Sequence, residues 1–207
     1  MIEYMLLASS SLFVIVDPIA TVPAFLAMTP GDTPQQRMKM ARLACAVMAG
    51  MLVLFAWVGL PIFRLLGISM PAFQLAGSIV LLLVAIDMLR ARRSPVHETV
   101  EETDAGLAKA DIAITPLAVP MLAGPGAITT AILLQKQADT LGKQFALLLC
   151  ILLVAGLSYL IFHLSAHGAK WLSPIALRLV TRIMGLLLAS LAVQFAFDAI
   201  KTQFGRG

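Results

Sequence analysis

The sequence predicts an all-α membrane protein with six transmembrane helices, arranged as two inverted three-helix repeats. Of its 207 residues, 60% are hydrophobic and only 13% are charged, and the mean hydropathy is +0.94. A soluble domain is about 45–50% apolar and about 25% charged. A chain of this composition cannot cover its surface with polar groups in water, so it belongs in a lipid bilayer. The other two observations are six apolar runs and a matching helix break in the first and fourth of them.

Six apolar runs have the length of about 20 residues that a helix needs to cross a bilayer. The N-terminal run is predicted to be a retained span, because Glu3 stands where a signal peptide has lysine or arginine. Cys45 and Cys150 both lie inside apolar runs and are interpreted as small buried hydrophobes, with no disulfide framework and no metal site. The six predicted spans are Met5–Met28, Met40–Phe63, Pro71–Leu89, Asp111–Leu134, Phe145–Ser165 and Ile175–Ile200.

The distribution of lysine and arginine predicts the orientation. Loops one, three and five carry eight of these residues, whereas the opposite side carries five. The positive-inside rule therefore places the three odd loops in the cytoplasm and both termini outside. The chain is predicted to be one membrane domain (1–207), with a first repeat at 1–93, a cytoplasmic linker at 94–110 and a second repeat at 111–207. The net charge of +4 does not indicate a nucleic-acid partner, because the basic residues are dispersed and form no stripe.

The two halves resemble each other at prolines and glycines, which are unusual inside a continuous helix. "VDPIATVPAFLAM" from Val16 aligns with "AGPGAITTAILLQ" from Ala123, which pairs Asp17 with Gly124 and Pro18 with Pro125. In spans three and six, Gly77 pairs with Gly185. The interval from proline to glycine is 59 residues in the first half and 60 in the second. Three spans per repeat make the halves antiparallel, and inverted repeats with Gly/Pro-interrupted spans are typical of secondary transporters.

Asp17-Pro18 and Gly124-Pro125 are predicted to start half-helices inside the bilayer. A proline lacks the N–H that continues a helix, and aspartate followed by proline is an N-cap followed by the first helical residue. Asp17 can cap its own helix, whereas Gly124 brings no acceptor and leaves its helix end open to an anion. We expect a ligand carboxylate at Gly124–Ala127, which includes Gly126, and a ligand ammonium or a proton at Asp17. The hydroxyls on adjoining turns are those of Thr21, Thr129 and Thr130.

The alternative interpretation is that Asp17 is only a cap and that the prolines are only kinks. A charge at the centre of a membrane costs about 2.5–3.5 kcal/mol on insertion scales, which favours a functional role. Arg182, about two turns into span six, could pair with Asp17 or Asp87, or extend to the cytoplasmic interface. Gly77 and Ser78 are interpreted either as a close helix contact or as part of the ligand site.

These motifs resemble the MarC family of bacterial inner-membrane proteins. The resemblance covers nearly the whole chain and is carried by "DPIATVPAF", "ISMPAFQLAGSIVLLLVAIDML", "PLAVPMLAGPGAITT" and "TRIMGLLLASLAVQFAFDAI". It implies six spans, a periplasmic N-terminus and transport of small neutral amino acids such as glycine or alanine. The chain departs from the family at Ala20, where glycine is common, and at Ser78, where "AGS" replaces "AGG"; both changes narrow the space beside the break. The motif positions carried over are Asp17, Pro18, Pro23, Gly77, Pro120, Gly124, Pro125, Gly126, Thr129 and Arg182.

The sequence therefore predicts a secondary transporter, not an enzyme, that moves a small zwitterionic amino acid between its two halves. Export and proton coupling are both compatible with this prediction, and we expect no cofactor and no metal. No GxxxxGK[ST] loop is present, so ATP is not the direct driver. A non-transporting scaffold or regulator is the second hypothesis. An intramembrane enzyme is the third, disfavoured because no serine–histidine or HExxH pattern appears and because Asp17 and Asp87 are predicted at different depths.

Overall fold

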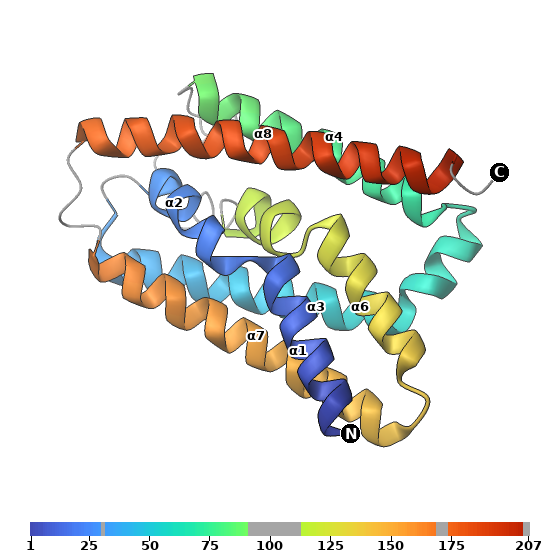
Figure 1. Cartoon of the computed structure of the whole chain (residues 1–207). Helices are drawn as coiled ribbons and strands as arrows, with labels where there is room; N and C mark the ends of the chain where they lie inside the picture. Colours follow the sequence, from blue (N-terminus) through green and yellow to red (C-terminus); the bar gives the residue numbers. More distant parts are fainter. Residues whose placement is uncertain (30–31, 91–112, 169–173, 205–207) are drawn as a thin grey trace.

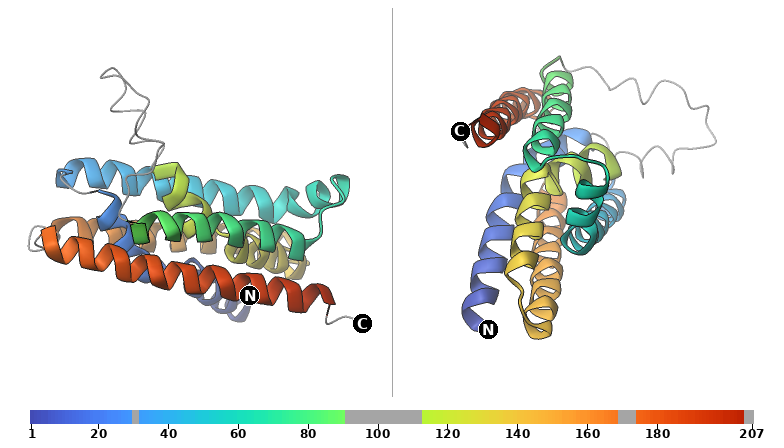
Figure 2. Two further views of the ribbon diagram at one scale, coloured as in Figure 1. Left: turned by 90° about the horizontal axis from the view of Figure 1, so that it is seen from above. Right: turned by 90° about the vertical axis from the view of Figure 1, so that its right-hand side faces the viewer.

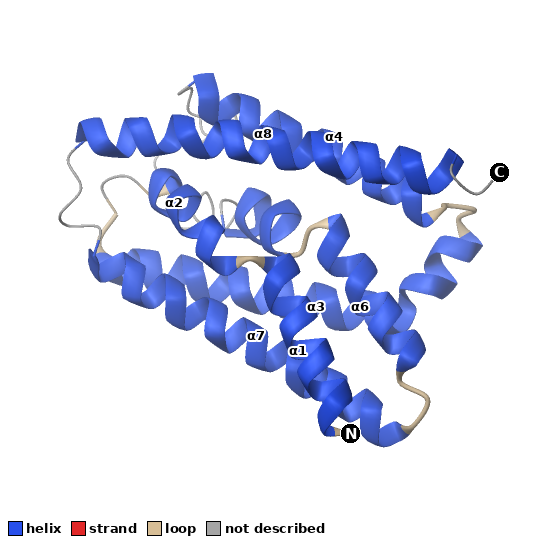
Figure 3. Ribbon diagram, viewed as in Figure 1, coloured by secondary structure: helices blue, strands red, loops and turns tan. Residues whose placement is uncertain are grey.

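The computed structural model describes residues 1–29, 32–90, 113–168 and 174–204, and every regular element in these ranges is helical (Figures 1 and 3). Five segments are long and apolar enough to cross a membrane, and η2 with α6 forms a sixth if this pair, bent by 59°, is one broken span. This count agrees with the six predicted spans. The predicted linker 94–110 lies outside the described residues. The elements are α1 (Ile2–Val16), α2 (Pro18–Met28), α3 (Pro34–Leu65), α4 (Met70–Arg90), η2 (Ala113–Leu122), α6 (Pro125–Gln137), α7 (Leu141–Gly168) and α8 (Pro174–Phe204).

Local sequence signals explain where α3 begins and ends. Thr33 caps its N-terminus by accepting a hydrogen bond from Gln36 N, and the Gln36 side chain accepts one from Thr33 N in return. Pro34 occupies the first helical position, where its missing N–H costs nothing. After the helix, Gly67 adopts a left-handed conformation with φ 64°, which glycine takes at no steric cost. The reversal from α3 to α4 is therefore encoded locally.

Helices at corresponding positions in the two halves lie beside each other. α3 lies along α7, and α4 lies along α8; the colours of Figure 1 show that the two members of each pair run in opposite directions. α1 and α6 also lie side by side and run in opposite directions. The N-terminus and the C-terminal end of α8 lie at the end of the molecule that carries the α3–α4 and α6–α7 connections (Figure 1). That placement is the one expected for an even number of spans.

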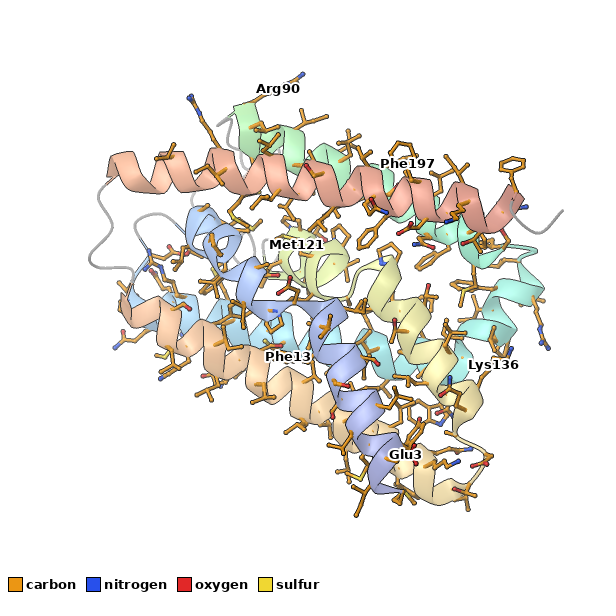
Figure 4. All side chains as sticks on the ribbon, viewed as in Figure 1. Glu3, Phe13, Arg90, Met121, Lys136 and Phe197 are labelled. Carbon is orange, nitrogen blue, oxygen red and sulfur yellow. The ribbon has the colours of Figure 1, made fainter. Side chains whose placement is uncertain are left out.

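Buried side chains form two separate cores. The larger core joins α1, α2, α3, η2, α6 and α7, which we call the bundle. Within it Phe25 of α2 packs on Phe162 of α7, with ring centroids 4.9 Å apart. The smaller core lies between α4 and α8, which we call the α4–α8 pair, and includes Ala24 of α2. Figure 2 shows this pair on one side of the bundle, and Met121 of η2, labelled in Figure 4, packs against its core.

Arg37 departs from its predicted environment. Its position after the first span placed it among the loop cations that set orientation, yet its side chain is only 7% exposed. Its guanidinium donates two hydrogen bonds to the carbonyl of Thr29 at the end of α2, from Nη2 at 2.9 Å and from Nε at 3.3 Å. A cation is favoured there because the last carbonyls of a helix carry partial negative charge. Arg37 thus ties the C-terminal end of α2 to α3, within the bundle.

Candidate functional site

The first span is broken at Asp17. This residue ends α1, with its N–H donating to Phe13 O at 3.0 Å, and it also starts α2. Its Oδ1 accepts a hydrogen bond from Ala20 N at 3.2 Å, so the side chain is an N-cap. Its φ of 43° and ψ of 63° are left-handed, and among the described residues it is the only non-glycine with positive φ. The following proline disfavours the right-handed helical conformation for Asp17, and aspartate is one of the few residues that tolerates the left-handed one.

The fourth span is also broken, at Gly124, but through an extended residue (φ −71°, ψ 171°), and the N-terminal end of its second helix has no side-chain cap. η2 ends at Leu122 and α6 begins at Pro125, and no side chain caps α6. Since proline has no N–H, the first unpaired donors of α6 are the N–H groups of Gly126 and Ala127. Gly124 is required for close packing, because an added Cβ would lie 2.6 Å from the carbonyl oxygen of Pro120. The end of α6 therefore keeps the partial positive charge that Asp17 offsets in α2.

The two breaks adjoin each other. A Cβ built on Gly126 would lie 3.4 Å from Cγ2 of Ile15, so the end of α1 touches the first turn of α6. At the far ends of the same two helices, the Tyr4 hydroxyl donates to the carbonyl of Leu134 at 2.9 Å. α1 and α6 are thus held together along their length, which brings the capped and uncapped helix starts into one region.

The α4–α8 pair covers the start of α6. Gly77 of α4 lies directly on Pro125, because a Cβ added to this glycine would overlap Pro125 Cγ. From α8, the ring of Phe195 comes within 3.7 Å of the place that a side chain on Gly126 would occupy. Ile15 and Phe195 were not selected from the sequence, since neither differs in character from its apolar neighbours. Only their placement shows that they line the region.

The predicted hydroxyls differ in their hydrogen bonding. Thr21 Oγ1 donates a hydrogen bond to Asp17 O at 2.9 Å, and Ser78 Oγ donates one to Leu75 O at 2.7 Å. Both hydroxyl protons are therefore engaged in hydrogen bonds to nearby backbone carbonyls. Thr129 Oγ1 is buried and finds no hydrogen-bond partner in the described structure. Thr130 is partly buried on the same helix. Thr129, one turn into α6, therefore carries a buried hydroxyl without a hydrogen-bond partner in the described structure.

Arg182 lies near the N-terminal end of α8. It is exposed on α8, and no ion pair joins it to Asp17. An exposed position lets the guanidinium keep polar surroundings while its methylene groups cover apolar surface. Asp87, the other partner considered from the sequence, has a side chain outside the described part. Asp17 is exposed, and its carboxylate accepts a hydrogen bond from Ala20 N.

A surface hollow lies elsewhere on the molecule. It has a volume of about 310 Å³ and is lined at the N-terminal end of α1 and the start of α7 by Met1, Glu3, Tyr4, Leu7 and Lys143. None of the residues at the helix breaks lines it. Within the described ranges, no group of three or more His, Cys, Asp or Glu side chains could hold a metal ion. The region between the breaks, not this hollow, joins a carboxylate with unpaired helix N–H groups.

The helices and their breaks define an integral, multi-pass membrane protein in which two spans are interrupted. The chain belongs to the MarC family: the model of the "MarC family integral membrane protein" matches residues 2–204. It is similar to UPF0056 membrane protein MJ1677 of Methanocaldococcus jannaschii, with 35% identity over 97% of each chain. It is also similar to UPF0056 membrane protein YvbG of Bacillus subtilis, with 36% identity over 94% of this chain and 92% of the relative. YhcE of Escherichia coli is 30% identical over 93% of this chain and 90% of its own. No solved structure matches the chain significantly.

Proposed function

We propose that this protein is a secondary transporter of small neutral amino acids in the bacterial inner membrane, with both termini in the periplasm. The observation that carries the proposal is the contrast between the two adjoining helix starts. The N-terminal end of α2 is capped by the carboxylate of Asp17, whereas the N-terminal end of α6 has no side-chain cap. One negative and one partly positive centre in the same region match the two charges of a zwitterion.

The packing of the helices supports an inverted repeat. The contact of α1 with α7 has its counterpart in that of η2 with α3, and the contact of α2 with α7 corresponds to that of α6 with α3. Likewise, the contact of α2 with α8 corresponds to the contact of α6 with α4. Such reciprocal packing is expected of two antiparallel halves related by a two-fold axis in the membrane plane. Alternating access then consists of a motion of one part against the other around a central site.

The surroundings of the uncapped end favour a small substrate. Gly126 is approached by Ile15 and Phe195, and Gly77 lies on Pro125, so little room is left beside the first turn of α6. In this proposal the substrate carboxylate accepts hydrogen bonds from the N–H groups of Gly126 and Ala127 and from the hydroxyl of Thr129. The ammonium group lies toward Asp17. In this proposal the substrate carries no side chain larger than a methyl group, because a leucine side chain would meet Ile15 and Phe195.

Uptake of labelled glycine and alanine into proteoliposomes tests the proposal, with leucine as the size control and with and without a pH gradient. We expect saturable flux of the small amino acids that Asp17→Asn reduces, because asparagine keeps a capping oxygen but removes the charge. Gly50→Ala is the matched control, because nothing lies within 4 Å of a Cβ at this position. Absence of flux for every amino acid would overturn the proposal and favour a scaffold or regulator.

A further inference from the structure

We propose that the surface hollow between the start of α1 and the start of α7 binds the headgroup of a zwitterionic phospholipid with a protonated amine, of the phosphatidylethanolamine type. In this site Lys143 lies against the lipid phosphate and Glu3 against the lipid ammonium. The site is separate from the helix breaks, and the inference does not depend on the transport proposal.

The hollow carries one charge of each sign. Its volume is about 310 Å³, and its lining joins the carboxylate of Glu3 and the ammonium of Lys143 with Tyr4 and the apolar side chains of Met1 and Leu7. Sites for small ligands have volumes of about 300–1,000 Å³ and combine apolar walls with a few polar groups. A headgroup with both a phosphate and an ammonium complements the two charges, whereas an anionic headgroup would leave Glu3 facing a like charge.

The hollow lies where two neighbouring spans begin. Glu3 precedes the apolar run that starts at Met5, and Lys143 precedes the one that starts at Phe145; α1 and α7 pack on each other. Both charges are therefore placed at the boundary between water and hydrocarbon, which is the depth of the lipid headgroups. Leu7 lines the hollow one turn further into the span and is 50% exposed. It leaves apolar surface for an acyl chain beside the headgroup, which a soluble zwitterion would not cover.

The fold holds Tyr4 and Lys143 in place within the hollow. Tyr4 is 8% exposed, and its hydroxyl donates to Leu134 O at 2.9 Å. Lys143 Nζ lies 5.9 Å from the centroid of the Tyr4 ring and 2.8 Å from Oδ1 of Asp139. Because an ammonium has three N–H donors, Lys143 keeps donors for a phosphate oxygen while Asp139 fixes its position. A cation that is already positioned loses less conformational entropy when the lipid binds.

Native mass spectrometry of the full-length protein in detergent tests this assignment. The probes are phosphatidylethanolamine, phosphatidylcholine and phosphatidylglycerol with identical acyl chains. Phosphatidylcholine has no N–H to donate to Glu3, and phosphatidylglycerol has no ammonium. We expect half of the protein to carry phosphatidylethanolamine at about a tenfold lower concentration than either other lipid, since a hydrogen bond to a charged group is worth about 1.5–3 kcal/mol.

Substitutions of the two charged residues are expected to have different effects. Glu3→Gln should abolish the preference for phosphatidylethanolamine over phosphatidylglycerol, because it removes the partner of the ammonium. Lys143→Gln should weaken all three lipids, since each carries a phosphate, whereas Lys143→Arg should retain them. Asp198→Asn and Lys136→Gln are the matched controls, because they remove exposed charges near the C-terminal ends of α8 and α6, outside the hollow. Both controls should leave the lipid preference unchanged.

Two results would overturn the assignment. The first is equal retention of the three lipids by the parent protein, or a preference that neither Glu3→Gln nor Lys143→Gln changes. The second comes from soluble glycerophosphoethanolamine, which has the same headgroup without acyl chains. If it binds at the same concentration as the lipid, the hollow is a site for a free phosphate ester and the lipid assignment is wrong.

Discussion

Gly77 of α4 and Pro125 of α6 are in direct contact, and the proline ring fills the space that a Cβ on the glycine would need. This contact joins the α4–α8 pair to the bundle at the first residue of the uncapped half-helix. The two residues are 48 positions apart in the chain. Their contact links the packing of α4 to the accessibility of the N-terminal end of α6. Both features follow from residue types that a continuous helix avoids.

Gly77→Ala is expected to lower the stability of the protein. The added methyl group overlaps Pro125 Cγ, and overpacking of this kind costs about 1–3 kcal/mol. Gly50→Ala is expected to raise the stability by up to about 1 kcal/mol, because it replaces a helical glycine where there is free space. Thermal unfolding of the two variants in the same detergent checks the difference. Equal midpoints for both variants would show that Gly77 does not touch Pro125.

Replacements of Asp17 are expected to separate its capping role from its charge. Asp17→Asn keeps a capping oxygen and tolerates the left-handed conformation, so its stability should stay close to that of the parent. Asp17→Ala loses the bond to Ala20 N, worth about 0.5–2 kcal/mol, and forces alanine into a conformation that costs about 1–2 kcal/mol. Asp17→Gly loses the cap but relieves the backbone, so it should lie between the other two. Thermal unfolding ranks the series, and an alanine variant as stable as the asparagine variant would contradict the capping role.

Arg37→Lys is expected to destabilise the protein, although it keeps the positive charge. Arg37 donates from two nitrogens to a carbonyl that is itself buried, and a hydrogen bond from a charged group is worth about 1.5–3 kcal/mol. Lysine is a point donor and cannot reproduce the planar two-nitrogen contact. Arg42→Lys, at an exposed position on the same helix, is the control and should change little. Thermal unfolding of both variants measures the difference in stability between them. That difference vanishes if Arg37 acts only through its charge.

The spans and their breaks were predictable because they depend on short-range signals. Apolar runs set the extent of each helix, and Asp17-Pro18 is an N-cap followed by a first helical residue, whichever tertiary structure surrounds it. The extended backbone at Thr115 and Val119 in η2 likewise follows from the prolines that come next. The left-handed conformation of Asp17 was not predicted, because an N-cap is usually extended.

The contacts between distant residues could not be predicted in the same way. Arg37 looked like any loop cation, and its burial depends on where the end of α2 meets α3. The sequence left three environments open for Arg182, namely a pair with Asp17, a pair with Asp87, or the cytoplasmic interface, and the structure shows its side chain exposed. Helix periodicity could not decide the point, since Arg182 is followed directly by the apolar run 183–189. Gly77 was singled out as either a packing or a ligand residue, and only its contact with Pro125 favours packing.

Thr129→Val is expected to separate stability from transport. The hydroxyl of Thr129 is buried without a hydrogen-bond partner in the described structure, and an unsatisfied buried polar group costs about 1–3 kcal/mol. Valine has nearly the same shape and removes that group, so thermal stability should rise or stay unchanged. Glycine uptake into proteoliposomes should fall instead, because the substrate carboxylate loses one donor beside the N–H groups of Gly126 and Ala127. Thr129→Ser, which keeps the hydroxyl, should restore uptake. A valine variant that is less stable than the parent but transports normally would contradict both the unpaired hydroxyl and its role in binding.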